Sequence, residues 1–197
     1  MPVIDYSGCP IEVAGQFVIK HKDYFNLKDL YYKLHEWLIE NGYASRNDQE
    51  YPETLMLERI TQEYGKETWL RWRNEKDVGS KFYKYTLYTD WHIILLKSAE
   101  VMHEGVKFKT NWGEVEITIN AKVIGDYNRN WQKSPIFSKI LPIFWNRIFK
   151  KDILMHRKEL YRDAYKFQNE IKEFLRLKTF LPEPETRFFP PLGLPKV

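Results

Sequence analysis

The 197-residue sequence contains a single cysteine, Cys9, so no disulfide bond can form within the chain. It lacks an N-glycosylation sequon, and no basic segment followed by an apolar run stands at its amino terminus. No stretch approaches the roughly 20 apolar residues that a membrane span requires. These absences lead us to expect a soluble, cytoplasmic protein with at most peripheral membrane contact.

Motifs for metals and nucleotides are also lacking. The nine glycines are scattered and form no phosphate-cradling loop, and the five histidines show no HExxH or other metal-ligand spacing. We therefore expect no metal and no cofactor, and no motif indicates an enzyme. Asp90 and His92, at positions i and i+2 of one strand, could pair for acid–base chemistry. Polar residues that face solvent explain this pattern more simply.

The sequence has no large excess of charge of one sign. Its 31 basic and 27 acidic residues are interspersed and leave a net charge of +4. A dedicated nucleic-acid binder usually carries a concentrated basic stripe, so the sequence gives no strong signal for a nucleic-acid partner. Aromatic residues are abundant instead, with 7 Trp, 13 Tyr and 12 Phe. Such side chains build either a broad core or a large interface.

The amino-terminal part predicts a strand over 11–20 and an amphipathic helix after it. Asn26 is a suitable N-cap, and Gly42 provides the left-handed stop. Residues 54–62 fit either a short helix or the first strand of a hairpin. We favour the hairpin, because Tyr64-Gly65-Lys66 is a sequence typical of a turn. A run that favours β-structure, with Trp69 and Trp72, follows it.

The segment KFYKYTLYTDWHIILLK (81–97) alternates apolar and polar residues over an unusual length. Residues 106–109 and 114–123 alternate in the same way, which predicts a meander of long antiparallel strands with one apolar face. Since ordinary strands run about 5–6 residues, the first of these must bend, and we place a bulge at Thr89-Asp90.

A long carboxy-terminal helical region is predicted to cover this sheet. Ser134-Pro135 is a good helix start, and Pro142 should kink or restart the helix. An apolar stripe facing one way continues through it: Phe144, Ile148, Leu160, Ala164, Phe167, Ile171 and Phe174. The apolar face of the strand at 81–97 is expected to pack against this helix.

Residues 1–180 are expected to form a single α+β domain, followed by an extended, proline-rich arm at 181–197. The arm is interpreted either as a strap over the protein's own core or as a segment that docks on a second copy or a partner. In both readings its contacts come from Phe188, Phe189 and Leu192.

This order of elements, a strand, a helix, four or five strands and a long helix, is similar to the helix-grip arrangement of START and Bet v 1-like proteins. The resemblance implies an apolar pocket between a curved sheet and the last helix. The leading hypothesis is a non-enzymatic module that holds a hydrophobic or lipid-like ligand there. The residues predicted to line the pocket are Tyr83, Tyr85, Trp91, Ile117, Ile119, Phe144 and Phe167. A filled core is the simpler explanation for each of them.

Two further interpretations stay open. The protein is alternatively a structural or assembly subunit, cellular or viral, that uses its aromatic surfaces and the 181–197 arm to contact copies or partners. The stretch SPIFSKILPIFWNRIFKK (134–151) mixes aromatic and basic residues, as membrane-surface helices do, although a core helix with a solvated rim also has this composition.

Overall fold

Five β-strands form one antiparallel sheet in the computed structural model, which describes residues 6–45, 52–61, 65–103 and 106–176. Strand β1 (Ile11–Phe25) and helix α1 (Leu27–Glu40) come first. Strands β2 (Glu53–Thr61), β3 (Gly65–Asp77), β4 (Tyr83–His103) and β5 (Val106–Gly125) follow. The last elements are helix α2 (Phe137–Ile143), a π-helical segment (Phe144–Ile148) and helix α3 (Lys150–Phe174).

The strands are ordered β1-β5-β4-β3-β2, so β1 and β2 form the two edges of the sheet. The predicted α+β class with long antiparallel strands is therefore confirmed. The predicted hairpin is also present, because Glu53–Thr61 pairs antiparallel with β3 and is not helical.

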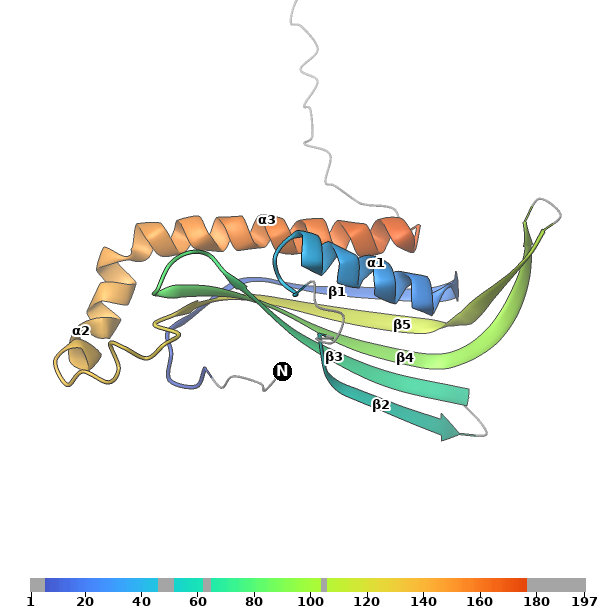
Figure 1. Ribbon diagram of the computed structural model, residues 1–197, viewed down its shortest axis with the longest axis horizontal. Coiled ribbons are helices and arrows are strands. Elements are labelled where there is room, and N and C mark those ends of the chain that lie inside the picture. Colours follow the sequence, from blue (N-terminus) through green and yellow to red (C-terminus); the bar gives the residue numbers. More distant parts are fainter. Residues whose placement is uncertain (1–5, 46–51, 62–64, 104–105, 177–197) are drawn as a thin grey trace, which may run out of the picture.

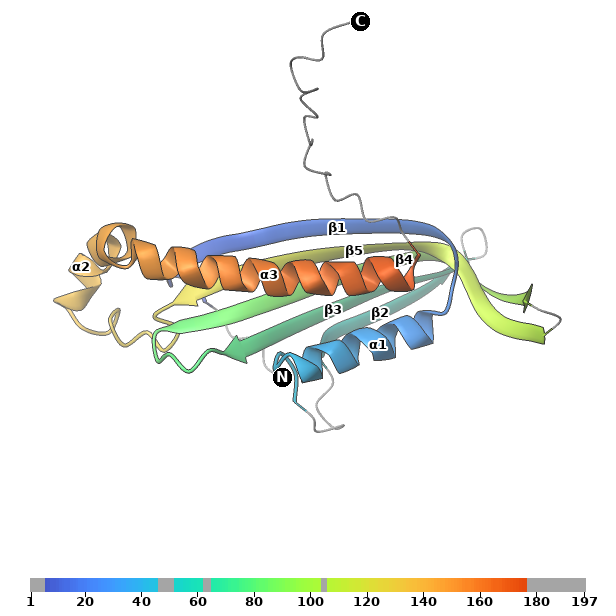
Figure 2. The same cartoon turned by 90° about the horizontal axis from the view of Figure 1, so that it is seen from above.

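Helices α1 and α3 lie side by side on one face of the sheet, and within the described residues the opposite face carries no helix (Figures 1 and 2). Helix α2 lies at one end of this layer, and the β4–β5 hairpin curves towards the helices at the other end (Figure 1). Within the described ranges, no helix is both long and apolar enough to cross a membrane.

Asn26 is the N-cap of helix α1, and its side-chain oxygen accepts hydrogen bonds from the backbone N–H groups of Lys28 and Asp29. The helix ends before Gly42, which has a φ of +76°. Its apolar stripe, with Leu30, Leu34 and Leu38 fully buried, packs on the sheet.

The core lies between the helices and the sheet. Alternate residues of β5 point into it, because successive side chains of a strand lie on opposite faces. The fully buried apolar residues of β4, β5 and α3 are Tyr85, Leu87, Ile93, Val115, Ile117, Ile119, Ala121, Val123, Leu160, Ala164, Phe167 and Ile171. Apolar strand faces of this length need a covering layer, and α3 provides it over β1 and β5.

The bend in β4 lies elsewhere than predicted. Thr89 and Asp90 belong to a regular ladder with β5, so the bulge expected there is absent. The register shifts instead between Ile94 and Lys97, and Leu95 has a φ of +58°. This irregularity lies opposite Gly113 of β5, whose missing Cβ leaves room for the displaced backbone.

The carboxy-terminal helices also differ from the prediction. Helix α2 begins at Phe137 with Ile136 as N-cap, and not at Ser134-Pro135. The π-helical segment begins at Phe144, two residues after Pro142, and the backbone N–H of Phe149 donates to the Phe144 carbonyl. A π turn changes the phase of the helix, so Ile148 is 58% exposed and does not continue the stripe of α3.

Candidate functional site

The region between β5 and α3 forms a protruding end of the molecule, called here the tip and defined as residues 133–151 (Figure 1). The loop that leads into it is fixed by Asp126, which is buried and has a φ of +48°. The Asp126 carboxylate accepts hydrogen bonds from the backbone N–H groups of Trp131 and Gln132, each at 3.1 Å. A loop closed in this way holds α2 at a defined place beside the sheet.

Aromatic rings attach the tip to the sheet. The ring of Trp131 lies 5.2 Å from that of Phe137 in α2 and 5.5 Å from that of Phe144 in the π-helical segment. It also lies 5.6 Å from the ring of Phe82, in the β3–β4 connection. These distances are typical of favourable aromatic pairs, each worth about 0.5–1.5 kcal/mol beyond its buried area.

The apolar residues that these rings do not cover face outward. Ile136 is 71% exposed, Ile143 is 55% exposed and Ile148 is 58% exposed, and Phe137 is half-exposed. Met155, at the start of α3, is 64% exposed. Single exposed apolar residues are ordinary, but three exposed isoleucines and Phe137 within one protruding segment favour a contact surface.

The tip also carries basic residues without any acidic residue among them. Residues 133–151 contain five basic residues and no acidic residue: Lys133, Lys139, Arg147, Lys150 and Lys151. All five are exposed. In the part of the chain that the structure describes, none of the five takes part in an ion pair. Exposed isoleucines and cations without ion pairs thus occur together in one segment of the chain, a composition typical of anion-attracting amphipathic surfaces.

Strand β2 carries a second group of exposed apolar residues, but its electrostatics differ. Leu57 is 54% exposed and Ile60 is 81% exposed at this edge of the sheet. Glu58 of the same strand forms an ion pair with Lys66, at 2.6 Å. No excess of cations accompanies the apolar residues of Glu53–Thr61, so this surface does not select an anion.

Six of the seven residues predicted to line a ligand pocket belong to one buried cluster. Tyr83, Tyr85, Trp91, Ile117, Ile119 and Phe167 are all at most 7% exposed and belong to the main core. Phe144 lies apart from them, half-buried in the aromatic cluster of the tip. The residues predicted for partner docking, Phe188, Phe189 and Leu192, lie outside the described residues.

A polar seam, which sequence reasoning missed, links α3 to the sheet. The Tyr85 hydroxyl donates to Oε2 of Glu159 at 2.9 Å and lies 2.7 Å from Nδ1 of His156. The Tyr43 hydroxyl donates to Oδ2 of Asp163 at 3.0 Å, and Lys76 donates to the same oxygen at 3.2 Å. Local sequence patterns do not reveal these pairs, because their members lie 71 to 120 residues apart in sequence.

The tyrosines of this seam are suited to structural links. Burial, followed by the hydrogen bond to Glu159, raises the pKa of Tyr85 above its ordinary value. Burial and the charge of Asp163 raise the pKa of Tyr43 in the same way. Burial raises the pKa of Tyr83 to about 12. Phenols in this state stay protonated at neutral pH and do not act as bases.

The side chains of Asp90 and His92 form hydrogen bonds with different residues. Asp90 accepts hydrogen bonds from Arg71 and Arg73, at 3.2 and 2.7 Å. His92 Nε2 lies 2.8 Å from Oε1 of Glu67, and its ring stacks on Trp69 at 5.2 Å. The hydrogen bonds and stacking thus tie each residue to β3, and they form a network on the polar face of the sheet.

No group of three or more His, Cys, Asp or Glu side chains in the described ranges could hold a metal ion. Cys9 is buried, and its thiol lies 3.7 Å from the backbone oxygen of Asp126. Burial of this kind favours an inert thiol.

No family model matches the chain, and no curated protein matches it by sequence. One solved structure that resembles it is an uncharacterised protein from Rhizobium leguminosarum, which is 8% identical in sequence. That likeness covers 86% of this chain and 99% of the other chain, with a TM-score of 0.20. It is too weak to indicate a fold or a function.

Proposed function

We propose that this protein is a non-enzymatic binding module that docks on anionic lipid surfaces through its tip. One observation carries the proposal: the tip exposes Ile136, Ile143 and Ile148 beside five exposed cations, with no acidic residue between 133 and 151. The cations attract an anionic surface over about a Debye length, and the isoleucines then enter the boundary between headgroups and acyl chains.

Rigidity supports this function. The aromatic rings around Trp131 and the loop closed by Asp126 hold α2 in place before any surface is met. A preorganised protrusion loses less conformational entropy on docking than a segment that orders only at the surface. Membrane contact of this kind is peripheral.

The finer description of the fold belongs to the same proposal. We infer a helix-grip-like architecture, because one helix follows β1 and the longest helix covers the sheet after β5. The predicted hydrophobic ligand between sheet and helix stays a prediction. We favour lipid contact at the surface, because Tyr85, Ile117 and Phe167 are fully buried against neighbouring side chains. Native mass spectrometry, with and without organic extraction, tests for a ligand inside.

The assembly alternative has one observation in its favour, the exposed residues Leu57 and Ile60 on the edge strand β2. Edge strands with exposed apolar side chains are prone to pair with other chains. Size-exclusion chromatography with light scattering measures the oligomeric state and so tests the assembly alternative. A discrete oligomer that the substitution Ile60→Ser dissociates would favour assembly over lipid docking.

Co-sedimentation with vesicles tests the leading proposal. Full-length protein is mixed with two kinds of phosphatidylcholine vesicle. One contains no anionic lipid, and the other contains about 30% phosphatidylserine. We expect sedimentation only with the anionic vesicles, and its loss in the double variant Ile143→Ser/Ile148→Ser. The control is Ile60→Ser, which removes an isoleucine of β2 that is 81% exposed, more than either of the two tip residues. Equal binding to neutral vesicles, or binding unaffected by the tip variant, would overturn the proposal.

A further inference from the structure

A groove about 590 Å³ in volume runs between α3 and the edge strand β1, beyond the tip. It is lined by Ala14, Leu154, Arg157, Lys158, Tyr161 and Arg162. We propose that this groove binds one molecule of an anionic glycerophospholipid, with the phosphate on the cations and the first acyl carbons on the apolar side chains. The inference rests on the proposed lipid docking and names the lipid class.

The floor and wall of the groove are built from packed parts. The register of β1 shifts between Val13 and Gly15, and Ala14 at this bulge is buried. The ring of Tyr161 packs on Phe17, at 5.7 Å between centroids. A Cβ on Gly15 would lie 3.2 Å from Cδ2 of Tyr161, so glycine allows the ring to lie close to the strand. Bulges often re-aim the chain beside binding sites.

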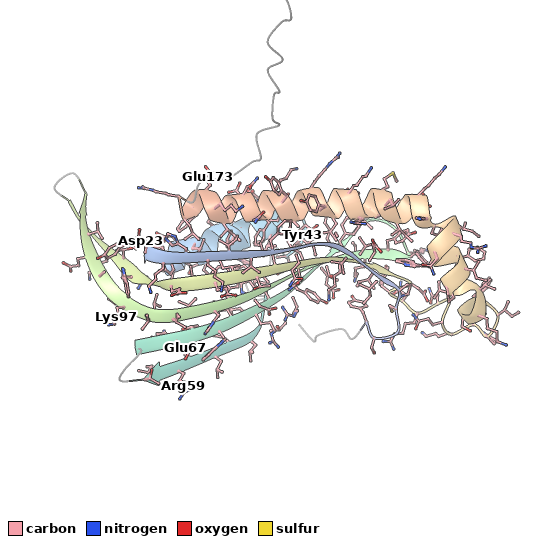
Figure 3. The ribbon with its side chains drawn as sticks, turned by 180° about the vertical axis from the view of Figure 1, so that it is seen from behind. Asp23, Tyr43, Arg59, Glu67, Lys97 and Glu173 are labelled. Atoms are coloured by element: carbon pink, nitrogen blue, oxygen red, sulfur yellow. The ribbon has the colours of Figure 1, made fainter. Side chains whose placement is uncertain are left out.

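The cations of the groove outnumber its carboxylates. Arg157 donates to Oε1 of Glu12 at 3.2 Å, which holds its guanidinium at the edge of β1. Lys158 and Arg162 lie four residues apart on α3, and so on the same side of the helix. Within the described residues, neither of these two takes part in an ion pair. Side chains with nitrogen at their ends are visible along the outer side of α3 (Figure 3).

Apolar atoms make the groove unlike a site for a bare anion. Leu154 is 39% exposed and Tyr161 is 44% exposed, and both line the same space as the cations. A phosphate ion would fill only a small part of this volume, whereas small-molecule sites occupy roughly 300–1,000 Å³. An amphiphile with an anionic head satisfies both kinds of lining.

The groove is within reach of a membrane that the tip contacts. Helix α3 begins at Lys150 in the tip, and Arg157 lies seven residues further along it. At a rise of about 1.5 Å per residue, the two positions are roughly 10 Å apart along the helix. Interfacial elements enter the headgroup region by about 5–10 Å, so one lipid of the same leaflet can reach the groove.

Titration calorimetry with lipid below its critical micelle concentration tests the groove without any membrane. The probes are dihexanoyl phosphatidic acid, dihexanoyl phosphatidylcholine and inorganic phosphate. We expect binding of the phosphatidic acid, at least about tenfold tighter than binding of the other two, since charge-assisted contacts and apolar burial both contribute. No binding of the phosphatidic acid would overturn the inference. Equal binding of inorganic phosphate would overturn it as well, by indicating a simple anion site.

Matched variants on α3 locate the site. Arg162→Glu should weaken binding of the phosphatidic acid by at least about tenfold, because it reverses a charge inside the groove. Lys166→Glu makes the same change four residues further on, at an exposed position outside the lining, and should leave binding within about twofold. Thermal unfolding of both variants checks the fold. Equal losses in the two variants would contradict the proposed site.

Titration calorimetry and vesicle co-sedimentation, measured on the same variants, separate this inference from the proposed function. The tip variant Ile143→Ser/Ile148→Ser should keep full affinity for monomeric phosphatidic acid while losing vesicle binding. If vesicle binding survives in the tip variant but the groove variant loses lipid, the docking proposal fails and the groove stands. If the tip variant loses vesicle binding and Arg162→Glu keeps full lipid affinity, the docking proposal stands and the groove fails.

Discussion

The indole of Trp145 packs directly on the backbone of Gly125, and a Cβ added to Gly125 would overlap the six-membered ring. Gly125 is the last residue of β5 and Trp145 lies in the π-helical segment. The contact therefore seats the tip on the end of the sheet. Neither residue is distinctive in the sequence, yet together they set where the tip stands.

Gly125→Ala should lower the free energy of unfolding by about 1–3 kcal/mol, the usual cost of inserting a methyl group into a packed contact. The reason is that Trp145 must move away from β5. Urea denaturation followed by circular dichroism measures the loss. In a Trp145→Leu background, the same substitution should cost less than half as much, because the overlapping ring is gone. Equal costs in both backgrounds would show that the contact does not hold the tip.

Leu95 in β4 adopts a left-handed backbone conformation that β-branched residues strongly disfavour. Leu95→Val should therefore lower the free energy of unfolding by about 1–2 kcal/mol. Leu95→Gly should stay within about 1 kcal/mol of the wild type, because relief of strain offsets the lost side chain. Ile94→Val is the matched control at the neighbouring, half-buried position and should cost about 0.5 kcal/mol. If Leu95→Val cost no more than Ile94→Val, the strain would be refuted.

This irregularity also shows where the sequence alone could not decide. The alternation in 81–97 predicts a long strand and its apolar face, and Tyr85, Trp91 and Ile93 are buried as the pattern requires. It does not reveal the bulge, because Leu95 and Leu96 are apolar residues in a run that fits an unbroken strand equally well. The cause is a backbone contact with Gly113, on a strand that sequence reasoning cannot align residue by residue.

The candidate site was predictable in composition and not in geometry. The mixture of aromatic and basic residues over 134–151 is visible in the sequence, but a core helix and a surface helix share it. Packing decides between them: Trp131 and Phe82 take up the aromatic rings, and the isoleucines remain outside. The groove depends on β1 and α3 meeting across more than 140 residues of sequence, as the pair of Glu12 and Arg157 does.

Tyr85 should make the protein sensitive to alkaline pH. Its pKa is raised in the fold, as are those of Tyr43 and Tyr83, whereas tyrosines of an unfolded chain ionise near 10.0. The unfolded chain therefore loses its tyrosine protons first. The stability that these groups contribute is fully present below pH 10 and declines as the pH rises beyond it. Urea unfolding at pH 8, 9.5 and 10.5 measures this decline.

Tyr85→Phe should make the decline shallower, because one of the shifted groups is gone. At pH 7 it should cost about 1–2 kcal/mol, since the hydrogen bond to the Glu159 carboxylate is lost. Tyr32→Phe is the control, because Tyr32 is 53% exposed and lies outside the seam. Identical pH profiles for Tyr85→Phe and the wild type would contradict a shifted phenol at this position.

Docking on anionic vesicles should depend on the free cations of the tip. Each basic residue near an anionic membrane contributes about 1 kcal/mol, or roughly fivefold in affinity. Lys150→Gln/Lys151→Gln should thus weaken binding by roughly 25-fold at low salt, and added salt should narrow the difference because it screens exposed charges. Lys20→Gln/Lys22→Gln is the matched control, since these exposed lysines of β1 already pair with Glu116 and Glu114. If the control pair weakened vesicle binding as much as the tip pair, binding would follow net charge alone. The tip would then have no special part in it.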